Sequence, residues 1–212
     1  MLKILSMRCR IHRQSADSVL QKKKQQAEAA AAGQTKNRVG GAKARIQHDL
    51  LRVGKQEEEE SRTGARPIKF EWKNGDDPFH FSVVIEPDEG MYKGGSFKFN
   101  FDIPEHDYPF EPPRVKCTQR IYHPNIDPQG NVCLNILRDG WTAALDVQAV
   151  AFGLLHAKTK QHIFIHTTYE DPLIQEVADD LRLNREGFRR NVRTAMQGGT
   201  VRNTQYDRVL KS

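Results

Sequence analysis

The sequence is poor in cysteine and has no long apolar run. Its three cysteines, Cys9, Cys117 and Cys133, are an odd set without paired spacing, which argues against a disulfide framework and favours a reducing compartment. A transmembrane helix needs about 20 consecutive apolar residues, and no stretch of the chain approaches that length. We therefore expect a protein with free thiols and no membrane partner.

The first 41 residues lack aromatic side chains and have few β-branched ones. Their Gln, Lys and Ala bias cannot bury enough apolar surface to offset the entropy cost of ordering the chain. We expect residues 1–41 to be a flexible arm. Residues 42–212 are long enough to form one domain with a sizeable core.

The formal net charge is +6, a sign shared by nucleic-acid-binding proteins, in which clustered Lys and Arg release counterions from phosphates. Here the basic residues are spread along the chain. The one compact run, Lys22–Lys24, lies in a tract typical of a solvated helix or flexible arm. An acidic protein partner explains the charge equally well, so we expect no nucleic-acid partner.

The spacing of apolar residues changes along the domain. Apolar residues first recur with helical spacing, then alternate with polar residues, then return to helical spacing. This predicts strands at Ile68–Phe70, Phe79–Ile85, Phe97–Ile103 and Arg114–Cys117, and helices at Ala42–Val53, Leu145–Leu155, Leu173–Leu183 and Arg185–Met196. The order indicates an α+β domain with an N-terminal helix, a four-stranded antiparallel meander and C-terminal helices.

The segment Tyr122–Leu134 carries the candidate chemistry. Its prolines and Gly130 predict an irregular loop, and a thiol on a fixed loop is both exposed and aimed, as a nucleophile must be. His123 is near enough in sequence to meet Cys133 across a folded loop. Two chemistries stay open: a hydrolase in which His123 deprotonates the thiol, or an acyl carrier in which the thiol exchanges with another thioester.

An acyl carrier needs two further groups near its thiol. The side-chain amide of Asn125 is a suitable donor to a developing oxyanion. Asp171, which precedes Pro172, is the carboxylate expected beside an incoming lysine. The competing interpretation of Asp171 is a helix N-terminal cap.

Structural interpretations compete for the cysteines as well. Cys133 as an inert core thiol is disfavoured by its position in the loop, whereas Cys117 falls in a strand-like segment and is expected to pack in the core. A zinc site built from Cys117, His123 and Cys133 would lack a fourth ligand and a CxxC pair. We therefore expect no metal.

The same residues carry a resemblance to a known family. HPNIDPQGNVCLNIL (His123–Leu137), followed by Trp141, with YPFEPP (Tyr108–Pro113) before it and EDPL (Glu170–Leu173) after it, closely resembles the motifs of the ubiquitin-conjugating enzyme family. The resemblance runs from about Arg45 to the C-terminus. It implies the ubiquitin-conjugating fold with its active-site loop, and a transferase that holds a ubiquitin-like modifier as a thioester and passes it to a lysine of another protein.

Three segments resemble the branch of this family that carries the modifier Nedd, also called Rub: Pro87–Gly95, Val132–Trp141 and Asn184–Gly199. The implied partners are the modifier, a heterodimeric activating enzyme, a RING-type ligase with a co-ligase, and cullins as acceptors, in the cytoplasm and nucleus. No cofactor is implied on this chain, because ATP is consumed by the activating enzyme.

The resemblance also assigns roles to single residues. The catalytic residues would be Cys133 for the thioester, Asn125 for the oxyanion and Asp171 for positioning the lysine. The residues that hold the active-site loop would be His123, Pro124 and Trp141. The partner-binding residues would be Met1, Ile4, Leu5 and Met7, which anchor the arm on the activating enzyme and the co-ligase, and Lys43 and Arg45 in the first helix.

Two segments depart from the family pattern, Arg8–Gln21 and His156–Thr168. Their composition differs from that of their neighbours, while the flanking motifs resume in register. Our hypothesis is that one or both are retained introns or gene-model errors, which sequencing of the mature transcript tests. Two alternative functions of the same fold stay open: a carrier of ubiquitin itself, and an inactive binding module.

Overall fold

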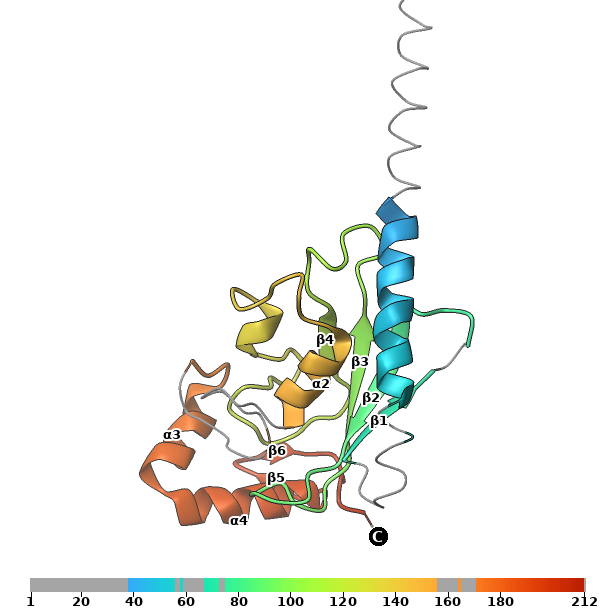
Figure 1. The fold of residues 1–212 in the computed structure, drawn as a ribbon. Coiled ribbons are helices and arrows are strands. Elements are labelled where there is room, and N and C mark those ends of the chain that lie inside the picture. The colour runs from blue at the N-terminus through green and yellow to red at the C-terminus, as the bar shows by residue number, and fades with distance from the viewer. Residues whose placement is uncertain are drawn as a thin grey trace, which may run out of the picture. The chain divides into compact units, whose positions relative to one another are not determined.

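The computed structural model describes residues 38–55, 58, 67–72, 75–155, 164 and 171–211. The chain forms two units, Met1–Gly41 and Ala42–Ser212, and the fold of the second is shown in Figure 1. The arm residues Met1, Ile4, Leu5 and Met7 and the segment Arg8–Gln21 lie outside the described residues. The segment His156–Thr168 also lies outside them, apart from Phe164.

The N-terminal helix, described over residues 38–55, turns one face toward the core. Ala42, Ile46 and Val53 are buried on that face, at the spacing of successive helical turns. Asp49 lies on the same face and is buried as well. The helix extends beyond both predicted ends, because a glycine such as Gly54 weakens a helix by only about 1 kcal/mol and does not by itself end it.

Four antiparallel strands form the main sheet, and they lie in chain order. They are β1 (Ile68–Glu71), β2 (His80–Ile85), β3 (Phe97–Asp102) and β4 (Arg114–Cys117). The register of β2 and β3 pairs Phe81 with Phe101 and Val83 with Phe99, and all four of these side chains are buried. The predicted meander is confirmed.

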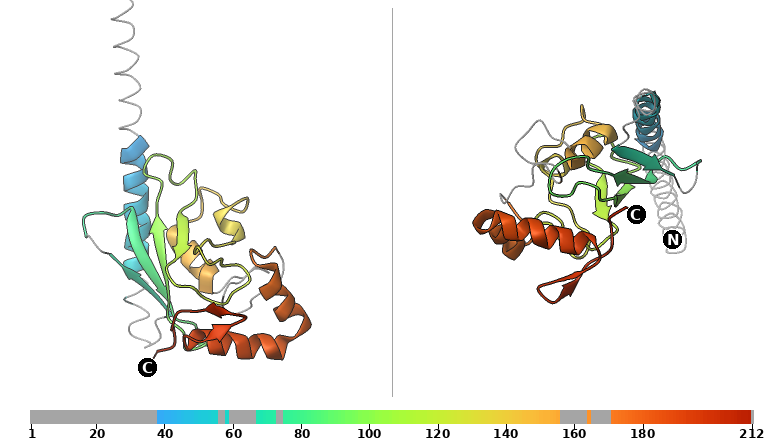
Figure 2. Two further views of the ribbon diagram at one scale, coloured as in Figure 1. Left: turned by 180° about the vertical axis from the view of Figure 1, so that it is seen from behind. Right: turned by 90° about the horizontal axis from the view of Figure 1, so that it is seen from below.

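Helix α2 (Val147–Leu155) lies on one face of this sheet, in contact with β1 and β2 (Figures 1 and 2). Most of its residues are buried, which agrees with a helix placed between the sheet and the rest of the domain. Helices α3 (Gln175–Leu183) and α4 (Arg185–Met196) follow beyond one end of the strands (Figure 1). The three C-terminal helices are confirmed.

Two short elements were not predicted. A hairpin of two-residue strands, β5 (Thr200–Val201) and β6 (Thr204–Gln205), follows α4, and η1 (Asn135–Leu137) follows the active-site loop. A strand of two residues is too short to show the apolar-polar alternation that predicts a strand from sequence. The hairpin turn places Arg202 and Asn203 at positive φ (49° and 64°). Turns of this kind are usually identified in a sequence by Asn-Gly or Asp-Gly, and Arg-Asn does not carry that signature.

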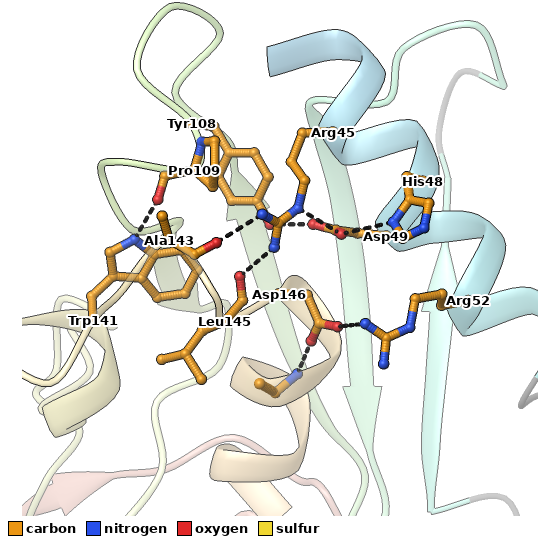
Figure 3. Close-up of polar contacts among 11 residues, drawn as sticks. Arg45, His48, Asp49, Arg52, Tyr108, Pro109, Trp141, Ala143, Leu145 and Asp146 are labelled. Atoms are coloured by element: carbon orange, nitrogen blue, oxygen red, sulfur yellow. Dashed lines mark hydrogen bonds and ion pairs between the residues drawn. The ribbon is translucent and has the colours of Figure 1, made fainter. Parts of the chain in front are cut away.

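A polar network centred on Arg45 joins the N-terminal helix to two loops (Figure 3). Arg45 Nε donates to Asp49 Oδ1 at 2.9 Å, and its two terminal nitrogens donate to the carbonyls of Ala143 and Leu145 at 2.7 Å each. The Tyr108 hydroxyl donates to Asp49 Oδ2 at 2.5 Å. We call these five residues the Arg45 network. The network supplies hydrogen-bond donors to the Asp49 carboxylate, which is 1% exposed. A carboxylate buried to this extent without such partners would carry a large desolvation cost.

Candidate active site

The loop from Tyr122 to Leu134 is irregular, but backbone contacts fix it. Single bridges pair His123 with Ile126 and Ile126 with Val132, and the Cys133 amide donates to the Asn125 carbonyl at 2.8 Å. Gly130 has φ 79°, and a Cβ atom there would lie 2.1 Å from the Cys117 carbonyl oxygen. Only glycine fits this position, so Gly130 allows the loop to pack against β4.

His123 lies beneath this loop and is completely buried. Its Nδ1 accepts a hydrogen bond from the Asn125 backbone amide at 2.9 Å. The rings of Tyr92 and Phe164 lie beside it, with centroids 5.2 and 5.8 Å away, and the Tyr92 hydroxyl donates to the Tyr122 carbonyl at 2.8 Å. This is the environment of a residue that supports a loop, because its ring nitrogen orients the backbone.

Pro124 connects the loop to the segment that precedes α3. Its carbonyl accepts hydrogen bonds from the amides of Leu173 and Ile174, at 2.9 and 3.0 Å. Pro124 is buried, so these two bonds are shielded from water. They hold Asp171, two residues before Leu173, against the active-site loop.

Asp171, Asn125 and Cys133 meet at one carbonyl oxygen. The Asn125 side-chain amide donates to Asp171 O at 3.2 Å, and Cys133 Sγ lies 3.5 Å from that oxygen and 3.6 Å from Asp171 Oδ2. Sequence spacing could not establish this proximity. The cap interpretation of Asp171 is wrong, because the N-cap residue of α3 is Ile174.

The surroundings of Cys133 favour its protonated form. Burial is the largest cause that raises the pKa of its thiol, and the Asp171 carboxylate raises it further by charge and by hydrogen bonding. Arg138 acts in the opposite direction and lowers this pKa; its Nη1 lies 4.0 Å from Asp171 Oδ2. Because the net pKa shift is upward, little thiolate exists at neutral pH, which differs from the activated thiolate of a Cys-His hydrolase.

Trp141 holds the neighbouring loop. Its indole nitrogen donates to the Pro109 carbonyl at 2.8 Å, and its ring lies 6.1 Å from that of Tyr108, measured between centroids (Figure 3). Tyr108 belongs to the Arg45 network. The loop after η1 is therefore fixed to the same network as the N-terminal helix.

The two basic residues predicted to bind partners have different environments. Lys43 is exposed on the N-terminal helix. Arg45 uses all three guanidinium nitrogens in contacts within the domain, a structural role that sequence reasoning missed. Its contact with an activating enzyme stays a prediction.

The second described cysteine, Cys117, is more deeply buried than Cys133. Cys117 is buried in β4, and its thiol donates to the Gln119 carbonyl at 3.3 Å. Burial raises the pKa of this thiol to about 11, so it is chemically inert at neutral pH. Over the described ranges, no three His, Cys, Asp or Glu side chains are grouped to hold a metal ion.

Sequence reasoning also missed a set of contacts that joins the loop to α3 and α4. The Tyr122 hydroxyl donates to Asp180 Oδ2, and the Asn191 side-chain amide donates to the same oxygen at 3.1 Å. Arg202 pairs with the other oxygen of Asp180. Asp180 therefore links Tyr122, next to His123, with α3 and α4, and no local sequence signal identifies a pair so far apart in the chain.

Together these observations define an α+β protein that presents one unactivated thiol beside an amide donor and a carboxylate, which is the arrangement of an acyl carrier. The family model described as "Ubiquitin-conjugating enzyme" matches residues 45–196, and the chain belongs to this family. It is therefore a transferase, and the fold expected from the resemblance is confirmed. In the part of the chain that the structure describes, no helix is long and apolar enough to cross a bilayer.

Several relatives share most of their length with this chain. The protein named NEDD8-conjugating enzyme UBC12 in Yarrowia lipolytica is 39% identical over 183 residues, which are 86% of this chain and 93% of the relative. The NEDD8-conjugating enzyme ubc12 of Schizosaccharomyces pombe is 47% identical over 137 residues, 63% of this chain and 73% of the relative. The solved structure of S. cerevisiae Ubc12 matches with a TM-score of 0.63 and 37% identity, covering 70% of this chain and 77% of that chain.

Proposed function

We propose that this chain carries NEDD8 (Nedd, or Rub) as a thioester on Cys133, receives it from an activating enzyme, and transfers it to a substrate lysine. The observation that carries the proposal is the meeting of Cys133 Sγ, the Asn125 amide and Asp171 at a single point on the surface. The choice of modifier is supported by the relatives, which bear the name NEDD8-conjugating enzyme.

Charging is an exchange between two thioesters. The sulfur of Cys133 attacks the carbonyl carbon of the modifier's C-terminal glycyl thioester on the activating enzyme. A new S–C bond forms at Cys133, the old S–C bond breaks, and the proton from Cys133 ends on the departing thiol. Because the pKa of Cys133 is raised, the free thiol stays protonated and resists unwanted oxidation between cycles.

Discharge is the attack of a lysine amine on the same carbonyl carbon. Negative charge develops on the carbonyl oxygen, and the Asn125 side-chain amide, which in the free chain bonds the same Asp171 oxygen that Cys133 Sγ contacts, is the proposed donor to it. The new C–N bond forms as the C–S bond breaks, and the attacking amine loses one proton to the departing Cys133 sulfur, which regenerates the thiol. The Asp171 carboxylate, 75% exposed, is placed to accept the proton that the ammonium of lysine must lose.

Membership of this family implies a ubiquitin-like modifier, an activating enzyme and a ligase as partners. We extend this to a heterodimeric activating enzyme, a RING-type ligase with a co-ligase, and cullins as the acceptors. The arm residues Met1, Ile4, Leu5 and Met7 are our candidates for anchoring on the activating enzyme and the co-ligase. The cytoplasm and nucleus are the proposed location, with ATP consumed by the activating enzyme.

A charging assay with two modifiers tests the proposal. The purified chain is mixed with ATP and either NEDD8 with its activating enzyme or ubiquitin with its own, and adducts that thiol reductants remove are measured. We expect an adduct with NEDD8 and little with ubiquitin. The Cys133→Ala variant should form none, and Cys9→Ser, the matched control in the arm, should charge as the wild type does.

The outcomes separate the alternatives. Equal or faster charging with ubiquitin would assign the chain to ubiquitin transfer. No charging with either modifier, from a chain with a cooperative unfolding transition, would identify an inactive binding module.

A further inference from the structure

A basic pocket lies between α4 and the connection that joins β2 to β3. Its lining consists of Gly90, Met91 and Lys93 from the connection and Arg185, Arg189, Arg190 and Arg193 from the helix, around a volume of about 660 Å³. Five of these seven residues are cationic and none is acidic. We call this site the arginine pocket, and the chemistry of thioester transfer makes no use of it.

The cations of the arginine pocket are not paired with acidic side chains in the described part of the chain, although Glu186 lies on the same helix. Ion pairs within 4.0 Å are found for Arg138, Arg182 and Arg202 elsewhere in the domain, whereas none joins Lys93 or the four pocket arginines to a described acidic residue. Lys93 and all four arginines are exposed. The pocket therefore keeps five cations available for a ligand.

The arrangement of these arginines also opposes the stability of the free helix. Arg185 and Arg189, and Arg189 and Arg193, are like-charged pairs four residues apart, a spacing that places them side by side and is destabilising. Arg185 also lies in the first helical turn, where the helix dipole disfavours positive charge, and Glu186 in the same turn offsets only part of this penalty. A bound anion would remove both penalties.

The chemistry of the lining selects the type of anion. Guanidinium groups bind phosphate through two parallel hydrogen bonds, with more geometric specificity than an ammonium group. Five cations around so small a volume require a ligand that holds several negative charges close together. Phosphate groups carry up to two charges each, whereas the carboxylates of an acidic peptide are spread along an extended chain.

The lining also argues against a peptide ligand. Met91 is its one large apolar side chain, and peptides are held mainly by apolar or aromatic anchors in grooves. We infer that the arginine pocket binds a compact anion with several phosphate groups, either free in solution or as the headgroup of a lipid. This site is independent of the proposed transfer function.

Calorimetric titration of the full chain with inorganic tripolyphosphate, at about 0.15 M salt, where diffuse surface attraction is screened, tests this inference. The expected result is saturable binding, with amide NMR shifts changing at residues 90–93 and 185–193. Replacing Arg189→Gln and Arg193→Gln together should weaken binding by about tenfold or more, because two charge-assisted contacts are lost. The pair Arg114→Gln and Lys116→Gln, exposed residues of β4 with the same charge change, should leave the affinity unchanged.

Vesicles of phosphatidylcholine, with and without phosphatidylinositol bisphosphate, distinguish the two sources of phosphate. Capture by the phosphoinositide vesicles that the Arg189→Gln/Arg193→Gln variant loses would indicate a lipid headgroup, and tripolyphosphate binding alone would indicate a free ligand. The inference is overturned if tripolyphosphate does not bind, or if the β4 control pair weakens binding equally. It is also overturned if polyglutamate or single-stranded DNA binds the pocket more tightly than tripolyphosphate does.

Discussion

The Arg45 network and the active site use charged groups in opposite ways. In the network, Arg45 meets Asp49 at 2.9 Å, and the carboxylate is 1% exposed. At the active site, Arg138 and Asp171 are 4.0 Å apart, and their side chains are 50% and 75% exposed. The first pair is tightly bonded around a buried carboxylate, and the second is loose and solvated.

This difference distinguishes the residues that fix the loops from the residues proposed to take part in transfer. The short hydrogen bonds of the Arg45 network are shielded from water and are not readily exchanged for bonds to solvent, so they fix the loops that flank the active site. Loose pairs are exchanged at little cost, so Asp171 and Arg138 can give up their contacts when a modifier or a lysine arrives. The raised pKa of Cys133 fits the same division, because a protonated thiol is a weak nucleophile in the free chain.

The largest effect is expected at the active site, on the rate at which the Asn125→Ala variant discharges its thioester. Asn125→Ala removes the proposed donor to the oxyanion, and the discharge of the thioester to free lysine should slow by about 10²- to 10³-fold, while charging is less affected. Single-turnover discharge of the preloaded thioester to free lysine measures this rate. Asn131→Ala, on the same loop but bonded to Asp127, is the matched control, and discharge from Asn125→Ala at the wild-type rate would remove Asn125 from the mechanism.

In the Arg45 network, Arg45→Met should destabilise the domain by about 3 kcal/mol, because it leaves the buried Asp49 without its cation. Arg52→Met is the matched control on the same helix. Arg52 pairs with Asp146 at 3.0 Å and is itself 58% exposed, and the buried Asp146 keeps a hydrogen bond from the Ala149 amide at 2.7 Å, so the expected loss is smaller than at Arg45. Urea unfolding measures both, and equal losses would show that the two ion pairs contribute alike.

The smallest effect is expected on the pKa of Cys133. Asp171→Asn removes a charge and an acceptor that raise this pKa, so it should lower the pKa, and alkylation of Cys133 by iodoacetamide at neutral pH should become faster. Arg138→Gln removes a group that lowers this pKa and should make alkylation slower. Peptide mass spectrometry at several pH values follows Cys133 alone. Shifts in the same direction for both variants would contradict the assigned electrostatics.

The sheet was predictable because its signal is local. Alternating aromatic residues around Phe97–Phe101 can bury one face only as a strand, and the structure pairs them with β2 in that way. The position of Cys133 on a fixed loop followed in the same manner from prolines and Gly130. Short-range patterns of this kind do not depend on the rest of the chain.

Contacts between distant segments were not predictable from spacing. Asp171 reaches Cys133 through bonds from Leu173 and Ile174 to the Pro124 carbonyl, so the sequence could nominate this carboxylate but could not establish its place beside the thiol. Asp49 was missed because a carboxylate within an apolar helical stripe is ordinarily solvated. Its partner Tyr108 lies in a connection whose path the sequence does not specify.

The most direct test of the account is the mass of the chain after incubation with NEDD8, its activating enzyme and ATP. The wild type should gain one modifier that a thiol reductant removes, and Cys133→Ser should gain one that resists the reductant, because an oxyester replaces the thioester. An adduct of the Cys133→Ala variant that remains sensitive to reductant would contradict the account, since the modifier would then be carried by another thiol.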